Sequence, residues 1–116
     1  MQYRAEVQRM LKPGEQVLAV CGSMYLTAVT DRAVYIKMKD GIHEIIYPCI
    51  REAKGMAYHI RTYQEYNLEK IEYLTLLTVG VRNYYTIDGL KGKDPNFAKV
   101  VQIIDEKCGA YGPLRD

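Results

Sequence analysis

The chain has 116 residues, of which 48% are apolar and 26% are charged. This length suits one domain with a single core, and the globular composition excludes extensive disorder or low-complexity sequence. Sixteen Lys and Arg residues against 14 Asp and Glu residues give a formal net charge of +2. A charge this small does not indicate a nucleic-acid partner, and no apolar run is long enough to span a membrane.

Tyrosine is unusually frequent, with 11 Tyr against one Phe and no Trp. Its ring packs while its hydroxyl reaches water or a partner, so tyrosine favours strands and half-buried surfaces. The composition indicates a β-rich domain with partly exposed sheet faces. A Tyr-lined interaction surface is the alternative interpretation.

The N-terminal part of the chain predicts a short helix followed by strands. Apolar residues recur at helical spacing over 2–11, and Pro13-Gly14 ends this helix. Strands joined by short turns are then expected over residues 16–23, 25–30, 33–39 and 42–47. Asp40-Gly41 is a strong hairpin signal, and Pro48 ends the last of these strands or marks an edge.

The strand predicted over 33–39 alternates between two faces. One face is apolar and consists of Val34, Ile36 and Met38. The other face carries Tyr35, Lys37 and Lys39. We therefore expect a half-buried strand whose second face lies in solvent.

The middle of the chain is less regular. Further strands are expected over residues 50–54, 56–63, 72–79 and 81–88. Residues 64–70 are polar and predict a connection. The last two strands turn or bulge at Gly80, and one long strand bent at Gly80 is the alternative.

The C-terminal part predicts an amphipathic helix. Asp94-Pro95 provides an N-cap followed by proline at the first helical position, and Gly109 provides a C-terminal stop. Apolar residues at helical spacing are Phe97, Val100, Val101, Ile104 and Cys108. We expect the short tail over 109–116 to be mobile.

These elements predict a mainly β fold with one C-terminal helix. About seven strands joined by tight turns pair in an antiparallel manner and curl or split into two packed sheets. The C-terminal helix is expected to cover an open end or face of the sheets.

Two local patterns carry a family resemblance. Residues 11–15 read LKPGE, and residues 28–36 read AVTDRAVYI. Together with the order of elements, these patterns resemble the bacterial pleckstrin-homology-like (PH-like) domains. That family often carries Arg where this chain has Ala33, and here the nearest Arg is Arg32. The resemblance covers residues 5–108.

The resemblance implies a partly open barrel of two nearly orthogonal antiparallel sheets, capped by the C-terminal helix. It implies a single PH-like domain over 1–116 with its core at about 5–108. PH-like domains bind proteins, peptides or lipids, and some bacterial members form ring-like oligomers. The fold alone does not choose among these roles.

The sequence contains no pattern typical of catalysis or of metal binding. Cys49 is the one cysteine expected to be accessible, whereas Cys21 and Cys108 fall on apolar faces. The His and Cys positions lack the paired spacing of a zinc site, and the glycines form no phosphate-binding loop. We predict neither an enzyme nor a cofactor. An odd number of scattered cysteines also favours a reducing compartment, and we expect a cytoplasmic location.

The candidate partner-binding residues are two tyrosines and four cations. They are Tyr84, Tyr85, Lys37, Lys39, Lys54 and Arg61. The two tyrosines occupy adjacent strand positions, so their rings point to opposite faces and at most one readily enters the core. The three lysines could gather on one sheet face and contact an anionic partner.

We therefore expect a non-enzymatic adaptor or inhibitor domain, of bacterial or phage origin. It would bind a protein partner, or a second copy of itself, through a strand edge or the Tyr-rich face. Binding to an anionic membrane surface is the alternative. We expect such binding to be weak, because residues 21–25 carry no basic side chain. Two further hypotheses are less favoured. One is a Cys-dependent enzyme. The other is a single-strand nucleic-acid binder that stacks bases on basic residues interleaved with tyrosines, namely Tyr58, His59, Arg61 and Tyr63, and Arg82, Tyr84 and Tyr85.

Overall fold

The computed structural model describes residues 2–22, 26–56, 72–80, 82–90 and 93–108. Its elements in chain order are α1 (Gln2–Met10), β1 (Val17–Cys21), β2 (Thr27–Thr30), β3 (Ala33–Met38), β4 (Gly41–Ile46), the 3-10 turn η1 (Tyr47–Cys49), β5 (Ile50–Met56), β6 (Tyr73–Thr78), β7 (Tyr84–Asp88) and α2 (Phe97–Cys108). Most of the strand predicted over 56–63, the connection over 64–70 and the tail over 109–116 lie outside the described residues.

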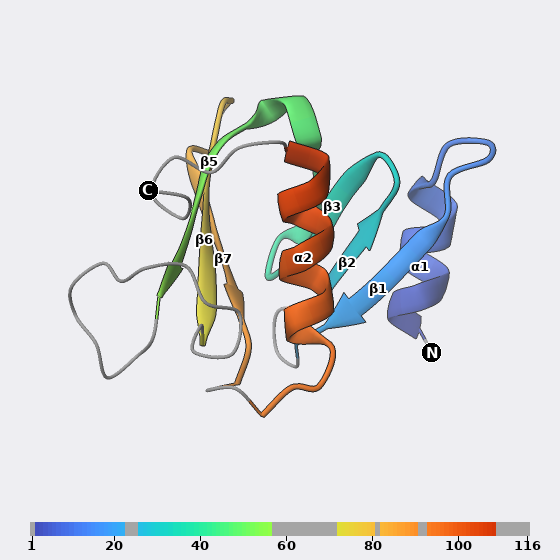
Figure 1. Ribbon diagram of the computed structural model, residues 1–116. Helices are drawn as coiled ribbons and strands as arrows, with labels where there is room; N and C mark the ends of the chain where they lie inside the picture. Colours follow the sequence, from blue (N-terminus) through green and yellow to red (C-terminus); the bar gives the residue numbers. More distant parts are fainter. Residues whose placement is uncertain (1, 23–25, 57–71, 81, 91–92, 109–116) are drawn as a thin grey trace.

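The strands form two antiparallel sheets. One contains β1, β2, β3 and β4 in that order, and the other contains β5, β6 and β7. Among the described residues no strand pairing joins the sheets into a closed barrel. Figure 1 shows the two sheets side by side, with α2 lying between them and α1 on the far side of the first sheet. The predicted mainly β fold with a C-terminal helix is confirmed.

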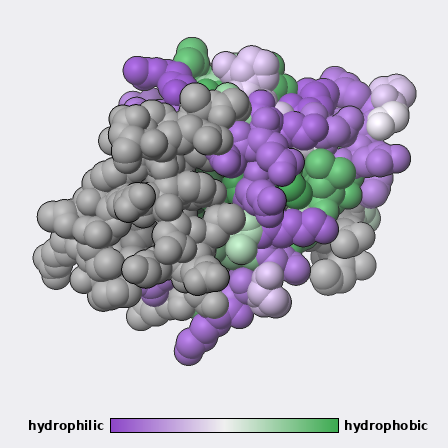
Figure 2. All heavy atoms as spheres, in the orientation of Figure 1, coloured by the Kyte–Doolittle hydropathy of each residue, from purple (hydrophilic) through white to green (hydrophobic). Residues whose placement is uncertain are grey.

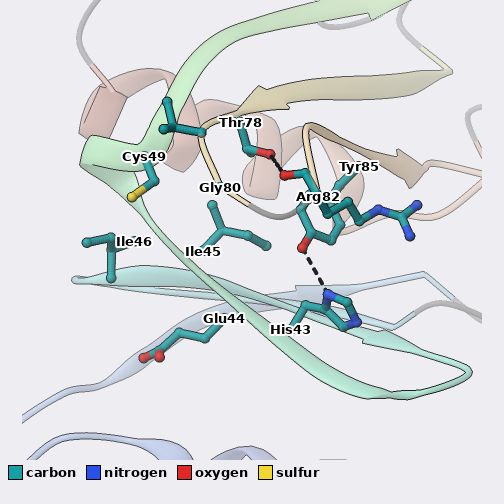
Figure 3. Close-up of a pocket in the computed structure, with 10 residues that line it drawn as sticks. His43, Glu44, Ile45, Ile46, Cys49, Thr78, Gly80, Arg82 and Tyr85 are labelled. Atoms are coloured by element: carbon teal, nitrogen blue, oxygen red, sulfur yellow. Dashed lines mark hydrogen bonds between the residues drawn. The ribbon is translucent and has the colours of Figure 1, made fainter.

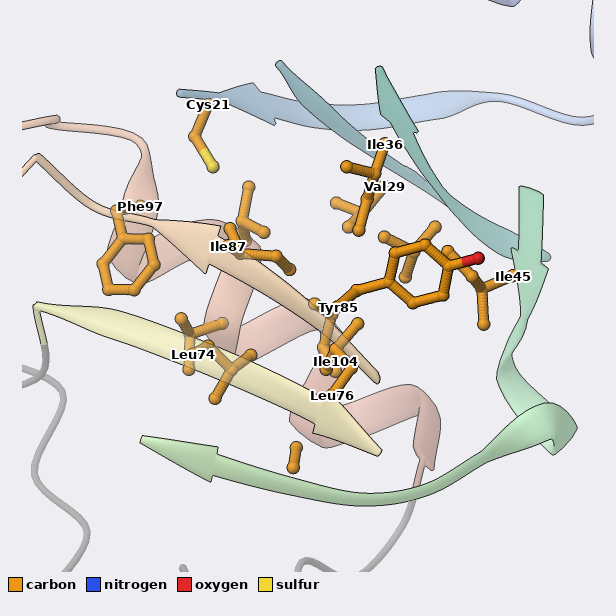
Figure 4. Packing of buried hydrophobic residues seen from close by; sticks show 14 of the residues in the cluster. Cys21, Val29, Ile36, Ile45, Leu74, Leu76, Tyr85, Ile87, Phe97 and Ile104 are labelled. Carbon is orange, nitrogen blue, oxygen red and sulfur yellow. The ribbon is translucent and has the colours of Figure 1, made fainter. Parts of the chain in front are cut away.

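The main core lies between the two sheets and α2 (Figure 4). The helix contributes Phe97, Val100, Val101 and Ile104, each at most 3% exposed. They pack against side chains such as Ile36 of the first sheet. The predicted apolar helix face is therefore confirmed. Within the described residues, neither helix is long and apolar enough to cross a membrane.

The second face of β3 differs from the prediction. Tyr35 is fully buried rather than solvated, because α1 covers this face of the sheet. Val7 of α1 packs there with Tyr35 and two alanines of β2 and β3. Lys37 lies at the border of this cluster, and its Nζ is 3.4 Å from the carboxylate of Glu6 on α1. Both faces of β3 thus belong to cores, one on each side of the sheet.

Two connections set the register of the strands that concern the site. Met38 pairs with Gly41, so Lys39 and Asp40 form the loop between β3 and β4, one residue earlier than predicted. β6 and β7 are two separate strands that pair in an antiparallel manner, and the alternative of one bent strand is wrong. The turn between them contains Gly80, whose φ of 135° favours glycine.

Candidate interaction site

Exposed apolar side chains are few and partly gathered. The large ones among the described residues are Leu18, Ile46, Val79, Tyr84 and Leu90. Ile46 and Val79 line one pocket, and Tyr84 lies beside Arg82, which lines the same pocket. In the view of Figure 2 hydrophilic side chains cover most of the described surface, with smaller apolar areas among them. This gathering marks the pocket as the candidate interaction site.

The pocket opens between β4 and the turn that joins β6 to β7, and its volume is about 380 Å³ (Figure 3). Residues 43–46 of β4 form one wall, and residues 78–80 form another. Cys49, Arg82 and Tyr85 complete the lining. Figure 3 places Cys49 and Ile46 at one end of the pocket and Arg82 at the other. The two ends therefore differ in chemistry, since one is apolar and the other is cationic.

The outer edge of β4 borders this pocket. Antiparallel pairs alternate between hydrogen-bonded and non-bonded positions. The closing pair Met38–Gly41 of the two-residue loop directs the backbone groups of His43 and Ile45 toward β3. Ile42, Glu44 and Ile46 alternate with these two residues along β4. Their backbone N–H and C=O groups therefore point away from β3. Within the described residues β4 has a strand neighbour on one side only.

The backbone around Ile46 supports this assignment. Ile46 lies opposite Ala33. The N–H of Ala33 donates to the hydroxyl of Thr30 on the neighbouring strand β2. Tyr47, the next residue, donates its N–H back to the carbonyl of Arg32. Ala33 and Ile46 are thus a non-bonded pair, and the N–H of Ile46 faces outward.

Tyr85 and His43 line the pocket and bond to each other. Nδ1 of His43 is 2.9 Å from the hydroxyl of Tyr85, and the two rings meet edge to face with centroids 5.5 Å apart. Nε2 of His43 is 2.7 Å from a carboxylate oxygen of Asp40. Burial raises the pKa of Tyr85, and the hydrogen bond to His43 lowers the pKa of Asp40. Both ring nitrogens of His43 therefore have partners, and its orientation is set.

Arg82 is held in place from several directions. Its guanidinium carbon lies 4.8 Å from the ring centroid of Tyr85 and 5.3 Å from that of Tyr84. Its Nε–H donates to the carbonyl of Tyr84 at 2.7 Å, and its own carbonyl accepts from the hydroxyl of Thr78 at 2.8 Å. Among the described residues no carboxylate lies within ion-pair distance of Arg82. The guanidinium is therefore ordered and forms no ion pair within the described residues, although Asp40 lies near enough for the two charges to interact.

A polar cluster on the opposite face of the sheet determines where Glu44 points. Glu15 of the LKPGE pattern is only 2% exposed at its side chain. Its carboxylate accepts hydrogen bonds from the hydroxyls of Thr30 (2.6 Å) and Tyr35 (2.8 Å), from the N–H of Lys12 (2.8 Å) and from Nε–H of Arg32 (3.1 Å). Arg32 also pairs with Glu44, and Figure 3 shows the Glu44 side chain directed away from the pocket.

The charge of Glu15 is stabilised by this cluster. Burial alone would raise the pKa of its carboxyl group, but the hydrogen bonds outweigh burial and lower the pKa to about 2. The Glu44 ion pair is the main reason that the pKa of Arg32 is raised. The two patterns that carried the family resemblance therefore meet in one hydrogen-bonded cluster, which ties the start of β1 to the β2–β3 turn.

The structure separates the sequence-predicted site residues. Tyr84 is 52% exposed, whereas Tyr85 is 7% exposed and packs in the core, so only Tyr84 offers its ring to a partner. Lys37 and Lys39 lie at the end of β3 and in the following turn, but Lys54 belongs to β5 in the other sheet. A cluster of the three lysines on one sheet face is therefore wrong. Arg61 lies outside the described residues.

Sequence reasoning missed two parts of the site. One is the outer edge of β4, which has no strand neighbour in the described part of the chain; it depends on the order of strands in the sheet, which periodicity does not reveal. Arg82 was noticed only as a neighbour of the tyrosines, and no local signal shows that its guanidinium lies against both rings.

The Cys-dependent enzyme hypothesis concerns Cys49. Cys49 and His43 both line the pocket, but the two ring nitrogens of His43 bond to Tyr85 and Asp40 rather than to Cys49. No group of His, Cys, Asp and Glu side chains suited to a metal ion occurs among the described residues.

The sequence matches no protein-family model and no curated protein, but the fold matches solved structures. A DUF1696-family protein with a pleckstrin-homology domain from Shewanella loihica is 13% identical, with a TM-score of 0.62 over 92% of this chain and 94% of that chain. A pleckstrin-homology domain from Shewanella amazonensis is 14% identical, with a TM-score of 0.63 over 94% of this chain and 97% of that chain. The chain therefore has the fold of the bacterial pleckstrin-homology domains, as its sequence patterns predicted.

Proposed function

We propose that this chain is a non-enzymatic interaction domain that binds an extended segment of a protein partner along the outer edge of β4. The observation that carries the proposal is the outward-facing backbone of Ile42, Glu44 and Ile46 directly beside the pocket. An added strand would satisfy these backbone groups, while the pocket would receive its side chains. Main-chain hydrogen bonds supply affinity in this mode of recognition, and pockets for alternate side chains supply specificity.

Edge strands in natural proteins are protected by charges, proline, bulges or a covering segment. At β4 the protection is confined to the ends, where Lys39 and Asp40 form the preceding loop and Pro48 follows in η1. The one charged side chain within the strand, Glu44, is bound to Arg32 on the face opposite the pocket. The central part of the edge is thus suited to accepting a strand.

The strand that pairs with the edge of β4 could also come from a second copy of this chain. Two β4 edges can pair in an antiparallel manner about a two-fold axis, which gives a closed symmetric dimer. Such a dimer would join the first sheets of two copies into one continuous sheet. The solution mass therefore belongs in the test, since it distinguishes a partner's segment from a second copy as the strand that occupies the edge.

The substitution Ile46→Pro tests the edge with little disturbance to the fold. Ile46 has φ of −71° and ψ of 146°, which a proline adopts without strain. The substitution removes an outward-facing N–H, whereas the ladder bonds to β3 remain. Ile46→Ala is the matched control, because it shortens the same side chain but keeps the N–H.

The assay is selection of random ten-residue peptides displayed on phage, together with light scattering of each variant. We expect the wild type to retain peptides and Ile46→Ala to retain them less well, because a side chain of the pocket is shortened. Ile46→Pro should retain them at least about tenfold less well than Ile46→Ala, since a buried hydrogen bond is lost and the strand is blocked. If the wild type is a dimer, Ile46→Pro should be a monomer. Equal retention by all three proteins, or no retention by the wild type, would show that the edge is not the binding site.

A further inference from the structure

We infer that the pocket selects an apolar residue followed, two positions later, by Asp or Glu in a peptide that runs antiparallel to β4. The apolar side chain would enter the end near Ile46 and Cys49, and the carboxylate would pair with Arg82. This inference rests on the proposed function and specifies the chemistry of the partner. It is carried by the two unlike ends of the pocket and by the alternation of side chains along β4.

The register of an added strand follows from the edge. On β4 the side chains of His43 and Ile45 face the pocket, and Figure 3 shows both directed into it. Peptide residues placed beside Ile45 and His43 share this face, because side chains opposite one another in a pair lie on the same side of the sheet. They are two residues apart. In an antiparallel peptide the residue beside Ile45 comes first along the chain.

The first of these positions meets apolar surface. Ile45 is buried, Ile46 and Val79 are exposed, and Cys49 is half-buried. The exposed fraction of Val79 is 60%, the largest among the exposed apolar side chains of the described residues. An aliphatic or aromatic peptide side chain would cover this surface and remove it from water, which is favourable in proportion to the area covered.

The second position meets the ordered cation. Nε of Arg82 is already bonded to the carbonyl of Tyr84, and no residue in the described part of the chain forms an ion pair with its terminal amino groups. Arginine suits carboxylates because its planar group donates two parallel hydrogen bonds. The rings of Tyr84 and Tyr85 already restrict the guanidinium, so less conformational freedom is lost on binding.

The charges around Arg82 are compatible with an acidic ligand. Asp40 is the acidic group at this end of the pocket, and its carboxylate is hydrogen-bonded to Nε2 of His43. Glu44 pairs with Arg32 on the other face of the sheet. Neither carboxylate forms an ion pair with Arg82. An incoming Asp or Glu would therefore form a direct ion pair with Arg82, whose charge interacts with Asp40 only at longer range.

A charge swap tests the inference. The peptide selection is repeated with Arg82→Glu and with Arg82→Gln, and Lys99→Gln serves as the matched control because Lys99 lies exposed on α2. We expect the wild type and Lys99→Gln to enrich peptides with an apolar residue followed two positions later by Asp or Glu. Arg82→Glu should enrich Lys or Arg at that second position, and Arg82→Gln should enrich neither charge.

A synthetic peptide then gives the magnitude. The probe is a fluorescein-labelled Ser-Thr-Val-Ser-Leu-Thr-Glu-Thr-Lys peptide, measured by fluorescence anisotropy beside the same peptide with Gln in place of Glu. We expect the exchange to weaken binding to the wild type by at least about tenfold, as for a charge-assisted hydrogen bond. It should change binding to Arg82→Gln by less than about twofold. Thermal unfolding of each variant confirms that it is folded.

The two proposals fail in different ways. If the wild type enriches peptides without a preference for an acidic residue, while Ile46→Pro still loses them, edge binding stands and the inference about Arg82 is wrong. The same conclusion follows if Arg82→Glu selects the same peptides as the wild type. If neither the wild type nor Ile46→Pro retains any peptide, both proposals are wrong.

Discussion

The charge of Glu15 should stabilise the fold in a pH-dependent way, and Glu15→Gln should remove that dependence. Glutamine keeps the shape of the side chain but replaces one acceptor oxygen with a donor amide. The four groups that bond to Glu15 all donate hydrogens. The variant therefore removes the negative charge to which these four donors bond, in a place where the side chain is 2% exposed.

The expected magnitude follows from the pKa. A carboxyl group whose pKa falls from an ordinary value of 4.5 to about 2 on folding gains at most about 3 kcal/mol, at roughly 1.36 kcal/mol per pKa unit. Solvent reaches the neighbouring Arg32 and Glu44, whose side chains are 30% and 33% exposed, and screens part of this interaction. We therefore expect a loss of about 2 kcal/mol for Glu15→Gln at pH 7.

The sign of the pH dependence is set by the lowered pKa. The stabilisation is fully present above about pH 5, where Glu15 is ionised in both states. It is lost as the pH falls from 4.5 toward 2, because the unfolded chain takes up the proton first. More than half of the wild-type advantage over Glu15→Gln should therefore have disappeared at pH 3.

Urea unfolding at pH 7, 5, 4 and 3 measures this difference, since other carboxyl groups titrate alike in both proteins and cancel. The control is Glu106→Gln on the exposed side of α2, whose difference from the wild type should stay within about 0.5 kcal/mol throughout. If the advantage of the wild type over Glu15→Gln is the same at pH 3 and pH 7, the ionised carboxylate is not what holds the cluster together.

Two further predictions concern the core. Ile104 is fully buried between α2 and the sheets, so Ile104→Ala should lower the free energy of unfolding by about 2–5 kcal/mol in urea, whereas Gln102→Ala on the exposed side should change it by less than about 0.5 kcal/mol. Gly89→Ala should lower the free energy of unfolding by about 1–3 kcal/mol through overpacking. The added Cβ would lie 2.6 Å from the ring of Phe97 and 2.8 Å from the carbonyl oxygen of Glu72. An unchanged melting temperature for Gly89→Ala or Ile104→Ala would contradict the packing described.

The sequence alone determined the elements whose signals are local. The face of α2 that enters the core is visible in the spacing of Phe97, Val100 and Ile104, because a helix repeats every 3.6 residues. Asp94 was predicted to cap this helix at its N-terminus, but α2 begins at Phe97, and Asp94 lies in the turn before it, where its Oδ1 accepts the N–H of Asn96 at 2.9 Å. Its second oxygen accepts the N–H of Gly22 at 2.6 Å. That bond crosses 72 positions of the chain, and nothing in the sequence near Asp94 indicates it.

Only the tertiary structure decided which surfaces are free. Alternation along 33–39 correctly places Tyr35 and Lys37 on one face, but a period of two does not say that α1 covers that face and buries Tyr35. Lys54 belongs to a different sheet from Lys37, because the chain passes from one sheet to the other between β4 and β5. The candidate site arises in the same way, since it brings His43 beside Tyr85, 42 positions away. Local propensity fixes where a side chain points from its own strand, whereas long-range packing fixes what it meets.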